Sequence, residues 1–249
     1  MASLASSLLR VCESLAFRLR RHLRSRAVRG TPAAGTDAFD TYELLLQLRG
    51  NAPRVAYDLG GNRGQWTVLA RSVFPAVEIH AFEPLPDHCT DYAARTRSLP
   101  HVHLHPVALG AAAAELEMDL TTFSDSASLL APTAVMAETY AVHSGRKVRV
   151  PVVRLDDWVA QHGLPLPDLL KLDLQGYELQ ALQGAPHCLR HARAVVLELS
   201  FREYYAGQPT PGTLLAYLEQ AGFRLAAFSP DLPAGRPLEQ ADALFLRDK

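Results

Sequence analysis

The sequence predicts one α/β domain built on a mostly parallel β-sheet and preceded by a short basic segment. Apolar runs of strand length alternate with stretches of helical periodicity, which is typical of right-handed βαβ units. The chain has 249 residues, of which 48% are hydrophobic, enough for one full core and a short appendage. We therefore place a basic amphipathic segment and linker at residues 1–36 and the α/β domain at residues 37–249.

Strand and helix signals alternate from the start of this domain. Short apolar runs predict strands at 54–58, 77–82, 102–109, 168–173 and 194–199. Apolar periodicity predicts helices at 37–48, 64–74, 86–97, 155–162 and 176–182. Segments 115–120 and 147–154 alternate apolar and polar residues, so we expect them to form an added hairpin.

The C-terminal part predicts an antiparallel end to the sheet. Thr210 is the expected N-cap of a helix over 210–221, and Gly222 stands where that helix should end. The last two strands, 223–228 and 243–247, are joined by a proline-containing segment without helical periodicity. Antiparallel strands need no crossover helix, so these two should pair antiparallel.

The first 30 residues are strongly basic, with seven arginines and a single acid, Glu13. Apolar residues recur there at intervals of three and four, which predicts a basic amphipathic helix. These positions are Leu4, Leu8, Val11, Leu15, Leu19 and Leu23. The pattern fits a peripheral contact with anionic lipid, an organellar transit peptide or a helix packed on the domain as a lid.

The rest of the chain constrains the compartment and the partners. With residues 1–30 at +6 and the whole chain at −1, the main body carries −7, which argues against non-specific nucleic-acid binding. Three widely spaced cysteines and no metal-type Cys/His spacing indicate a reducing compartment, no disulfide framework and no metal site. We expect a cytoplasmic protein, with peripheral attachment at the inner face of the membrane as the alternative.

A glycine-rich turn follows the first strand, which ends at Asp58. Gly60, Asn62 and Gly64 stand at every second position after it, and Gly61 adds a third glycine. Glycine lets a ligand approach the backbone closely, and the following helix directs free N–H groups at that ligand. A carboxylate at Asp58 would repel a pyrophosphate but attract an ammonium group. S-adenosylmethionine carries such an ammonium, so we predict this loop as its binding site.

Glu83 strengthens this interpretation. It ends the second strand, nineteen residues after Gly64, where a carboxylate can accept both hydroxyls of a ribose. Two acids at the ends of successive strands, with glycines between them, are unusual for a plain surface turn.

The body of the chain, roughly residues 54 to 228, resembles the FkbM-type methyltransferase family. The shared motifs, in order, are Asp58-Leu59-Gly60-Gly61-Asn62-Arg63-Gly64, Phe82-Glu83-Pro84, Val107-Ala108-Leu109-Gly110, Ser126-Ala127-Ser128-Leu129, Val153-Arg154-Leu155-Asp156, Lys171-Leu172-Asp173-Leu174-Gln175-Gly176-Tyr177-Glu178 and Leu182-Gln183-Gly184-Ala185. The resemblance implies a Rossmann-like seven-stranded methyltransferase sheet, mostly parallel with a C-terminal antiparallel strand and with helices on both faces.

The resemblance also implies a cofactor and a type of acceptor. The cofactor is S-adenosylmethionine, and the acceptor is a hydroxyl of a sugar, glycan or natural product. Val107 and Ala108 are then expected near the adenine, with Asp125 and Ser126 covering it. Gly61 stands where the family usually has alanine, and His105 near where it often has asparagine.

The catalytic group is expected at the end of the 168–173 strand. Lys171 and Asp173 alternate there and share one face, and Glu178 follows in the first turn of the next helix. Methyl transfer needs a positioned oxygen and a proton acceptor. Asp173 is our first candidate for that acceptor, Glu178 the second, and Lys171 would orient Asp173.

Two residues near the next strand are candidates for the acceptor pocket. Glu198 lies near the end of that strand, and Tyr204 follows it, where its ring could stack on a sugar. His101, His103 and His105 share a face, but no carboxylate is fixed beside them by spacing, so we interpret them as solvated or core histidines.

Three alternative functions were weighed. An NAD(P)-dependent oxidoreductase would share the glycine turn, but the usual Gly-x-Gly-x-x-Gly order is missing and Asp58 is badly placed for a pyrophosphate. A nucleic-acid methyltransferase could use the N-terminal arginines, but the acidic body opposes it. A non-catalytic scaffold is disfavoured because nothing at the glycine loop is degraded.

Overall fold

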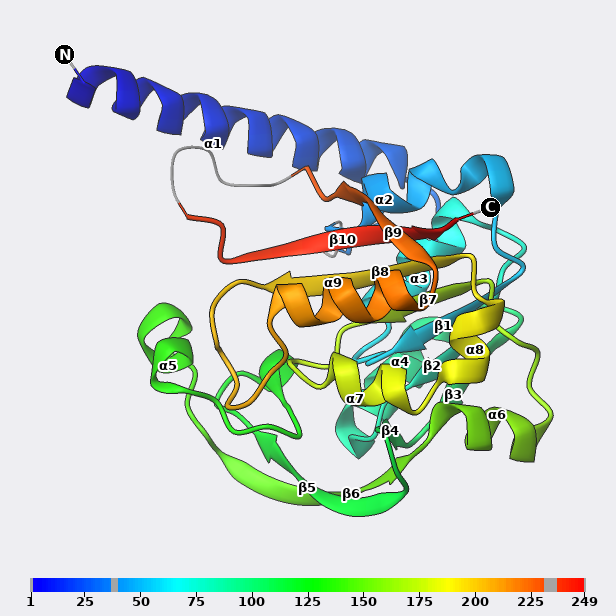
Figure 1. Ribbon diagram of the computed structural model, residues 1–249. Coiled ribbons are helices and arrows are strands. Elements are labelled where there is room, and N and C mark those ends of the chain that lie inside the picture. Colours follow the sequence, from blue (N-terminus) through cyan, green and yellow to red (C-terminus); the bar gives the residue numbers. More distant parts are fainter. Residues whose placement is uncertain (1, 37–39, 231–236, 249) are drawn as a thin grey trace.

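The computed structural model describes residues 2–36, 40–230 and 237–248, and its centre is a seven-stranded sheet (Figure 1). The order of the strands is β3-β2-β1-β7-β8-β10-β9. Their bounds are β1 Val55–Leu59, β2 Glu78–Phe82, β3 Val102–His105, β7 Leu169–Leu172, β8 Ala194–Ser200, β9 Phe223–Phe228 and β10 Gln240–Arg247. The first five pair in parallel, whereas β10 is antiparallel to both β8 and β9. The predicted fold class and the antiparallel C-terminal pair are confirmed.

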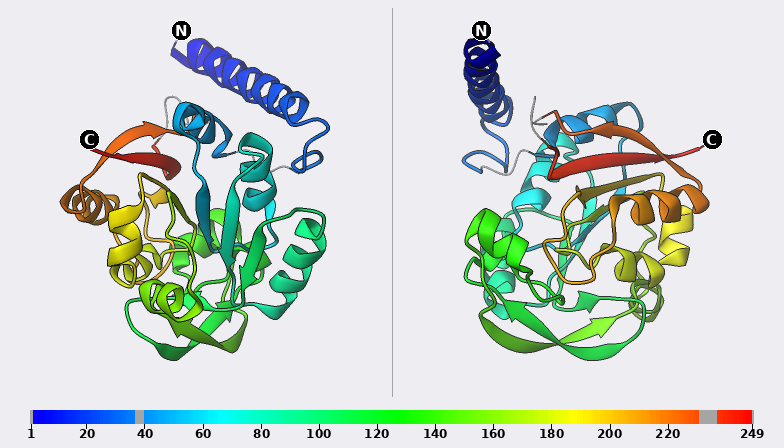
Figure 2. Two further views of the ribbon diagram at one scale, coloured as in Figure 1. Left: turned by 90° about the vertical axis from the view of Figure 1, so that its right-hand side faces the viewer. Right: turned by 60° about the vertical axis from the view of Figure 1, so that its left-hand side comes forward.

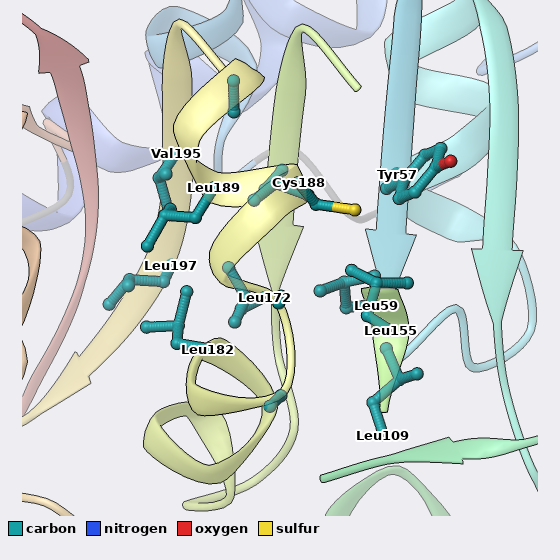
Figure 3. Packing of buried hydrophobic residues seen from close by; sticks show 14 of the residues in the cluster. Tyr57, Leu59, Leu109, Leu155, Leu172, Leu182, Cys188, Leu189, Val195 and Leu197 are labelled. Carbon is teal, nitrogen blue, oxygen red and sulfur yellow. The ribbon is translucent and has the colours of Figure 1, made fainter. Parts of the chain in front are cut away.

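Helices cover both faces of this sheet, because successive strand residues point to opposite sides. Their bounds are α2 Tyr42–Gln47, α3 Gln65–Val73, α4 Pro86–Thr96, α6 Leu155–His162, α7 Glu178–Gln183, α8 Pro186–His191 and α9 Pro211–Gln220. Tyr57 and Leu59 of β1 belong to a buried cluster with residues of α6 to α9. Figure 3 shows part of this cluster, with Leu155 of α6, Leu182 of α7 and Cys188 of α8. Ala56, the residue before Tyr57, packs with α2 and α3 on the other face.

The prediction of a single strand at 102–109 is wrong. It divides at Pro106 into β3 and β4 (Ala108–Leu109). Proline cannot donate a ladder hydrogen bond, and the backbone N–H of Val107 turns back to the carbonyl of His105 (2.9 Å). The chain thereby leaves the main sheet and enters a second one.

This second sheet has the order β4-β6-β5. The expected pairing of 115–120 with 147–154 is confirmed, because β5 (Ala114–Leu120) runs antiparallel to β6 (Arg146–Val153). The two strands are not joined by a tight turn. The intervening chain forms the 3-10 turn η2 (Ser124–Ser126) and the helix α5 (Ala134–Tyr140), which the periodicity did not predict.

Helix ends differ where backbone geometry overrides periodicity. The predicted helix at 176–182 begins at Glu178, because Gln175 (φ 52°) and Gly176 (φ 93°) adopt the left-handed conformation of a turn. Within the predicted helix at 37–48, α2 starts at Tyr42, and residues 37–39 lie outside the described residues. The helix α8 was not predicted; Pro186 stands at its first helical position, where proline favours the start of a helix. Thr210 caps α9 as expected, accepting from the N–H of Thr213.

The basic segment forms α1 (Ala2–Ala27), which stands away from the α/β body for most of its length (Figure 2). The interpretation as a lid packed by its leucines does not fit, since Leu15 and Leu19 are each 60% exposed. Among the described residues, α1 contacts the body through polar side chains toward its C-terminal end, where Arg24 is buried.

Candidate active site

A cavity of about 850 Å³ opens where the parallel strands end. The loop between β1 and α3 forms one wall, and the segment after β7 forms another. A narrow extension of about 60 Å³ continues toward the end of β2. Gly60, Asn62, Asp125, Asp173 and Gln175 line both spaces, so the two meet at the glycine loop.

The glycine loop has a conformation that requires glycine at Gly60. Its φ is 83°, and a Cβ there would overlap the carbonyl oxygen of Asp173. The N–H groups of Gly60 and Gly61 both donate to the carbonyl of Phe82 (3.0 Å each), which ties the loop to the end of β2. Gly64, with φ 81°, precedes the first turn of α3. The glycine backbone therefore allows the loop to lie directly against the end of β2 and the carbonyl of Asp173.

Asp58 lies behind this loop and not in the cavity. Its carboxylate is fully buried and is absent from the residues that line either space. Lys171 Nζ lies 3.0 Å from Asp58 Oδ1, and Thr67 Oγ1 donates to Oδ2 (2.8 Å). The predicted direct grip on an ammonium group is thus replaced by an ion pair within the protein.

Lys171 connects the buried acid to the open cavity. Its Nζ donates to the carbonyl of Gly60 (2.9 Å) and lies 3.7 Å from Asp173 Oδ2. Burial alone would lower the pKa of Lys171, but the charges of Asp58 and Asp173 outweigh it and raise the pKa. The ammonium therefore stays charged and fixes the glycine loop and Asp173 relative to each other.

Asp173 is the acid that the cavity exposes, with 45% of its side chain accessible. Gln175 Nε2 donates to Asp173 Oδ1 (2.7 Å). Gln175 is itself held by Tyr205, whose hydroxyl bonds to Gln175 Oε1 (2.8 Å) and to the carbonyl of Ser126 (2.9 Å). The carboxylate is accordingly oriented from two sides and still open to a ligand.

Glu83 and an apolar wall define the narrow extension. Glu83 Oε2 accepts from the N–H of Asn62 (2.9 Å), so it keeps a further lone pair, whereas Oε1 accepts from the N–H of Leu85 (2.9 Å) and also lies 3.4 Å from His88 Nδ1. Val107 and Ala108 line the same space, as expected. Asp125 lines both spaces, with Arg63 Nε 3.8 Å away, and Ser126 lines the larger one.

Besides Asp58 and Gly64, two further predicted site residues are absent from the lining of both spaces. Glu178 is buried, and its Oε1 accepts from the N–H groups of Leu174 (2.9 Å) and Gly176 (3.2 Å), so it braces the turn after β7. Tyr204 is also buried, with its hydroxyl directed at Glu239 Oε2 (3.3 Å). Neither is among the lining residues of the two spaces. Both residues were predicted to face the cavity, because the sequence indicates which strand or helix end they lie near but not the direction of their side chains.

The far wall of the cavity is acidic. Glu198 lines it, as predicted, together with Asp242 and Gln240 from β10, which were not predicted. Glu198 and Asp242 are direct cross-strand partners. Burial raises the pKa of Glu198 well above its usual value, and the charges of Asp173 and Asp242 raise it further. Gln240 Nε2 donates to Glu198 Oε2 (2.8 Å).

Further lining residues come from segments without a sequence signal. Met136, Tyr140 and Val142 belong to α5 and the residue pair after it, and Phe123 belongs to the preceding turn. The order of polar and apolar residues in this stretch matched no strand or helix template. A family of related sequences would be needed to single them out.

The histidines of β2 and β3 form a hydrogen-bond chain apart from the cavity. Trp158 Nε1 donates to His105 Nδ1 (3.2 Å), His105 Nε2 lies 3.1 Å from His80 Nδ1, and His80 Nε2 lies 3.0 Å from Glu78 Oε1. Because an indole N–H only donates, His80 Nε2 carries a proton, whereas a metal there would need its lone pair. Glu78, His80 and His103 have ligand atoms within 4.8 Å of one another, but this proton direction opposes metal binding.

The fold combines a parallel sheet with an antiparallel C-terminal pair. The site adds an acid near the end of the first strand, a glycine loop and a carboxylate directly after the second strand. Together these features define an S-adenosylmethionine-dependent methyltransferase. The comparisons with known proteins give the family. The chain belongs to the FkbM methyltransferases, whose methyltransferase FkbM domain model matches residues 58–225.

Three relatives illustrate this membership. The chain is 25% identical to the 2-O-methyltransferase NoeI of Sinorhizobium fredii, over 70% of this chain and 74% of that protein. It is 27% identical to the 31-O-demethyl-FK506 methyltransferase FkbM of Streptomyces tacrolimicus, over 76% and 80%. It is 24% identical to the hexuronic acid methyltransferase AglP of Haloferax volcanii, over 64% and 61%. The NAD(P)-dependent alternative is therefore not supported.

Proposed function

We propose that this enzyme methylates a hydroxyl of a small sugar-like or natural-product acceptor, with Asp173 as the proton acceptor. The observation that carries the proposal is the position of Asp173, an accessible carboxylate where the larger cavity meets the narrow extension. The names of the relatives support the acceptor class, since NoeI and FkbM are O-methyltransferases by name and AglP acts on a hexuronic acid.

The residues present fit S-adenosylmethionine. Glu83 Oε2 retains a lone pair for a ribose hydroxyl, and Val107 and Ala108 offer an apolar surface to the adenine. The extension is smaller than the ~300–1,000 Å³ usual for small-molecule sites. Binding of a nucleoside therefore requires the lining of this extension to widen. When bound, the cofactor supplies an electrophilic methyl carbon on a sulfonium.

The chain's own residues then provide orientation and a base. Lys171 and Gln175 hold the Asp173 carboxylate from two sides, so little reorganisation is needed when it accepts the hydroxyl proton. With the cofactor bound, Asp173 would accept the proton of the acceptor hydroxyl as its oxygen displaces the methyl group from the sulfonium, whose carbon–sulfur bond would break to leave a neutral thioether.

The acidic wall narrows the acceptor class. Asp40, Asp173, Glu198 and Asp242 all line the larger cavity, and Lys171 is engaged by Asp58. A carboxylate or phosphate on the acceptor would be repelled there, whereas a neutral hydroxyl compound or an amino sugar would be accepted. We therefore expect selectivity against uronic acids and nucleic acid, in contrast to the substrate that the name of AglP indicates.

The test measures transfer of a labelled methyl group to matched acceptors: a neutral glycoside, the corresponding uronic acid and the corresponding amino sugar. Asp173→Asn should lower kcat by roughly 10²–10⁴-fold with cofactor affinity retained by calorimetry. The matched control is Asp157→Asn on α6, where the acid is 66% exposed and outside both spaces. Full turnover of Asp173→Asn, or preference for the uronic acid, would refute the respective part of the proposal.

A further inference from the structure

The helix α1 is turned with its apolar side away from the protein. Leu8, Val11, Leu15, Leu19 and Leu23 are between 55% and 60% exposed, and they lie on one side of the helix at intervals of three and four. We call these five residues the leucine stripe. An amphipathic helix of a water-exposed protein normally buries such a stripe against the core. Here the exposed fractions show that, among the described residues, the body does not cover the stripe, and Figure 2 shows the helix itself standing away from the body.

The opposite side of α1 makes the contact with the body, and that contact is polar. Arg24 Nε and its terminal nitrogen donate to the carboxylate of Glu43 (2.8 and 2.7 Å). Arg20, one turn earlier, donates to the carbonyl of Pro230 (2.7 Å). Residues four apart share a face, so these arginines fix the orientation of the helix and keep the leucine stripe directed outward.

The spacing of the stripe is not that of a coiled coil. Successive positions are separated by three, four, four and four residues, a mean above the 3.5 that a left-handed seam between two helices requires. This spacing instead keeps the apolar residues on one side of a straight helix. A flat apolar surface, and not a second copy of α1, is the matching shape.

The charge of the segment identifies that surface. Residues 1–30 contain seven arginines and one acid, whereas the remainder of the chain carries −7. Arg18 and Arg26 are exposed on the same helix as the stripe. A leucine side bordered by arginines matches a membrane interface, where leucines enter the acyl boundary and guanidinium groups meet anionic headgroups.

We propose that α1 lies in the plane of an anionic lipid surface and attaches the enzyme to it. In the described residues, no helix has the length and apolarity needed to pass through a bilayer. In Figure 1 the N-terminal half of α1 extends beyond the sheet toward the side at which the parallel strands end. Attachment by the leucine stripe thus leaves the catalytic domain beside the lipid surface, held through Arg20 and Arg24.

The test is co-sedimentation of the full chain with vesicles of phosphatidylcholine alone and of phosphatidylcholine with one quarter phosphatidylglycerol. Binding should require the anionic lipid and weaken as salt is raised from 50 to 300 mM, because the attraction is screened. Leu15→Glu should lower the apparent partition coefficient roughly tenfold or more, since a leucine no longer enters the apolar layer.

Phe17→Glu is the matched control. Phe17 is 48% exposed but lies two residues from Leu15, on the other side of the helix, and the substitution adds the same charge. Both variants should keep cofactor affinity, which separates this proposal from the catalytic one. Equal binding of Leu15→Glu and wild type, or no binding to anionic vesicles, would overturn the proposal. A dimer in sedimentation that Leu15→Glu dissociates would do the same, by assigning the stripe to a second copy.

Discussion

Replacing Lys171 with methionine should destabilise the protein far more than removal of an ordinary ion pair. The substitution leaves the Asp58 carboxylate, which is fully buried, without its positive partner at 3.0 Å. Removing one member of a buried pair typically costs about 3–5 kcal/mol. For a chain of this size, 1 kcal/mol corresponds to roughly 2–4 °C in Tm, so we expect a decrease of about 6–20 °C.

The pH dependence of this loss has a definite sign. Burial already raises the pKa of Asp58 in the folded wild type, where Lys171 opposes the shift, so the loss of Lys171 raises this pKa further above its value in the unfolded chain. The folded state then binds more protons than the unfolded state, so stability falls as the pH rises through the interval between the two pKa values. The difference between variant and wild type should therefore be smaller at pH 5 than at pH 7.

The assay is urea denaturation at both pH values, with Lys147→Met as the matched control. Lys147 pairs with Glu117 at 3.8 Å on the surface, where both side chains are more than half exposed, so its loss should cost under about 1 kcal/mol. The double variant Asp58→Asn/Lys171→Met should recover most of the stability, because no buried charge remains. Equal effects of the two lysine substitutions would refute the assignment of Lys171 as the partner of a buried acid.

Two further predictions concern the loop and the acidic wall. Gly60→Ala should cost ~1–3 kcal/mol more than Gly163→Ala in urea denaturation, because both glycines have positive φ but only the first would overlap the backbone of Asp173; equal costs would contradict the packing argument. Glu198→Gln should stabilise the protein by up to about 1 kcal/mol by removing a like charge opposite Asp242, and more so at higher pH, where the carboxylate ionises through its raised pKa. The same variant should abolish any increase in amino-sugar affinity with rising pH, measured by calorimetry, and a persistent increase would assign that titration to another group.

The parts of the site that could be predicted from sequence are local. The loop after β1 and the acid that ends β2 follow from glycines and carboxylates at fixed distances from apolar runs. Strand ends of a parallel sheet meet at one edge, so Asp173 and Glu83 could be placed at the cavity before any contact was known. Each of these two acids directly follows a strand in the structure, as the sequence predicts.

What could not be predicted depends on side-chain partners and on distant strands. The acid–base pairing of Asp58 with Lys171 joins residues 113 positions apart, and nothing in the spacing tells whether a carboxylate faces a ligand or a lysine. Asp242 reaches the cavity only because β10 inserts antiparallel between β8 and β9, with a register that sets it opposite Glu198. The sequence predicts a strand at 243–247, but it does not predict which residue of β10 lies opposite Glu198.

The cross-strand pair of Glu198 and Asp242 bears on function as well as on packing. Like charges directly opposite on neighbouring strands are destabilising, and this pair is half-buried at the wall of a cavity that already contains Asp173. Lys171, the lysine nearest to these acids in the cavity lining, is committed to Asp58. A fold selected for stability alone would place a neutral residue at one of the two positions. The position of this pair at the cavity wall supports the proposed acceptor class, because hydroxyl donors or an ammonium group would meet these carboxylates favourably.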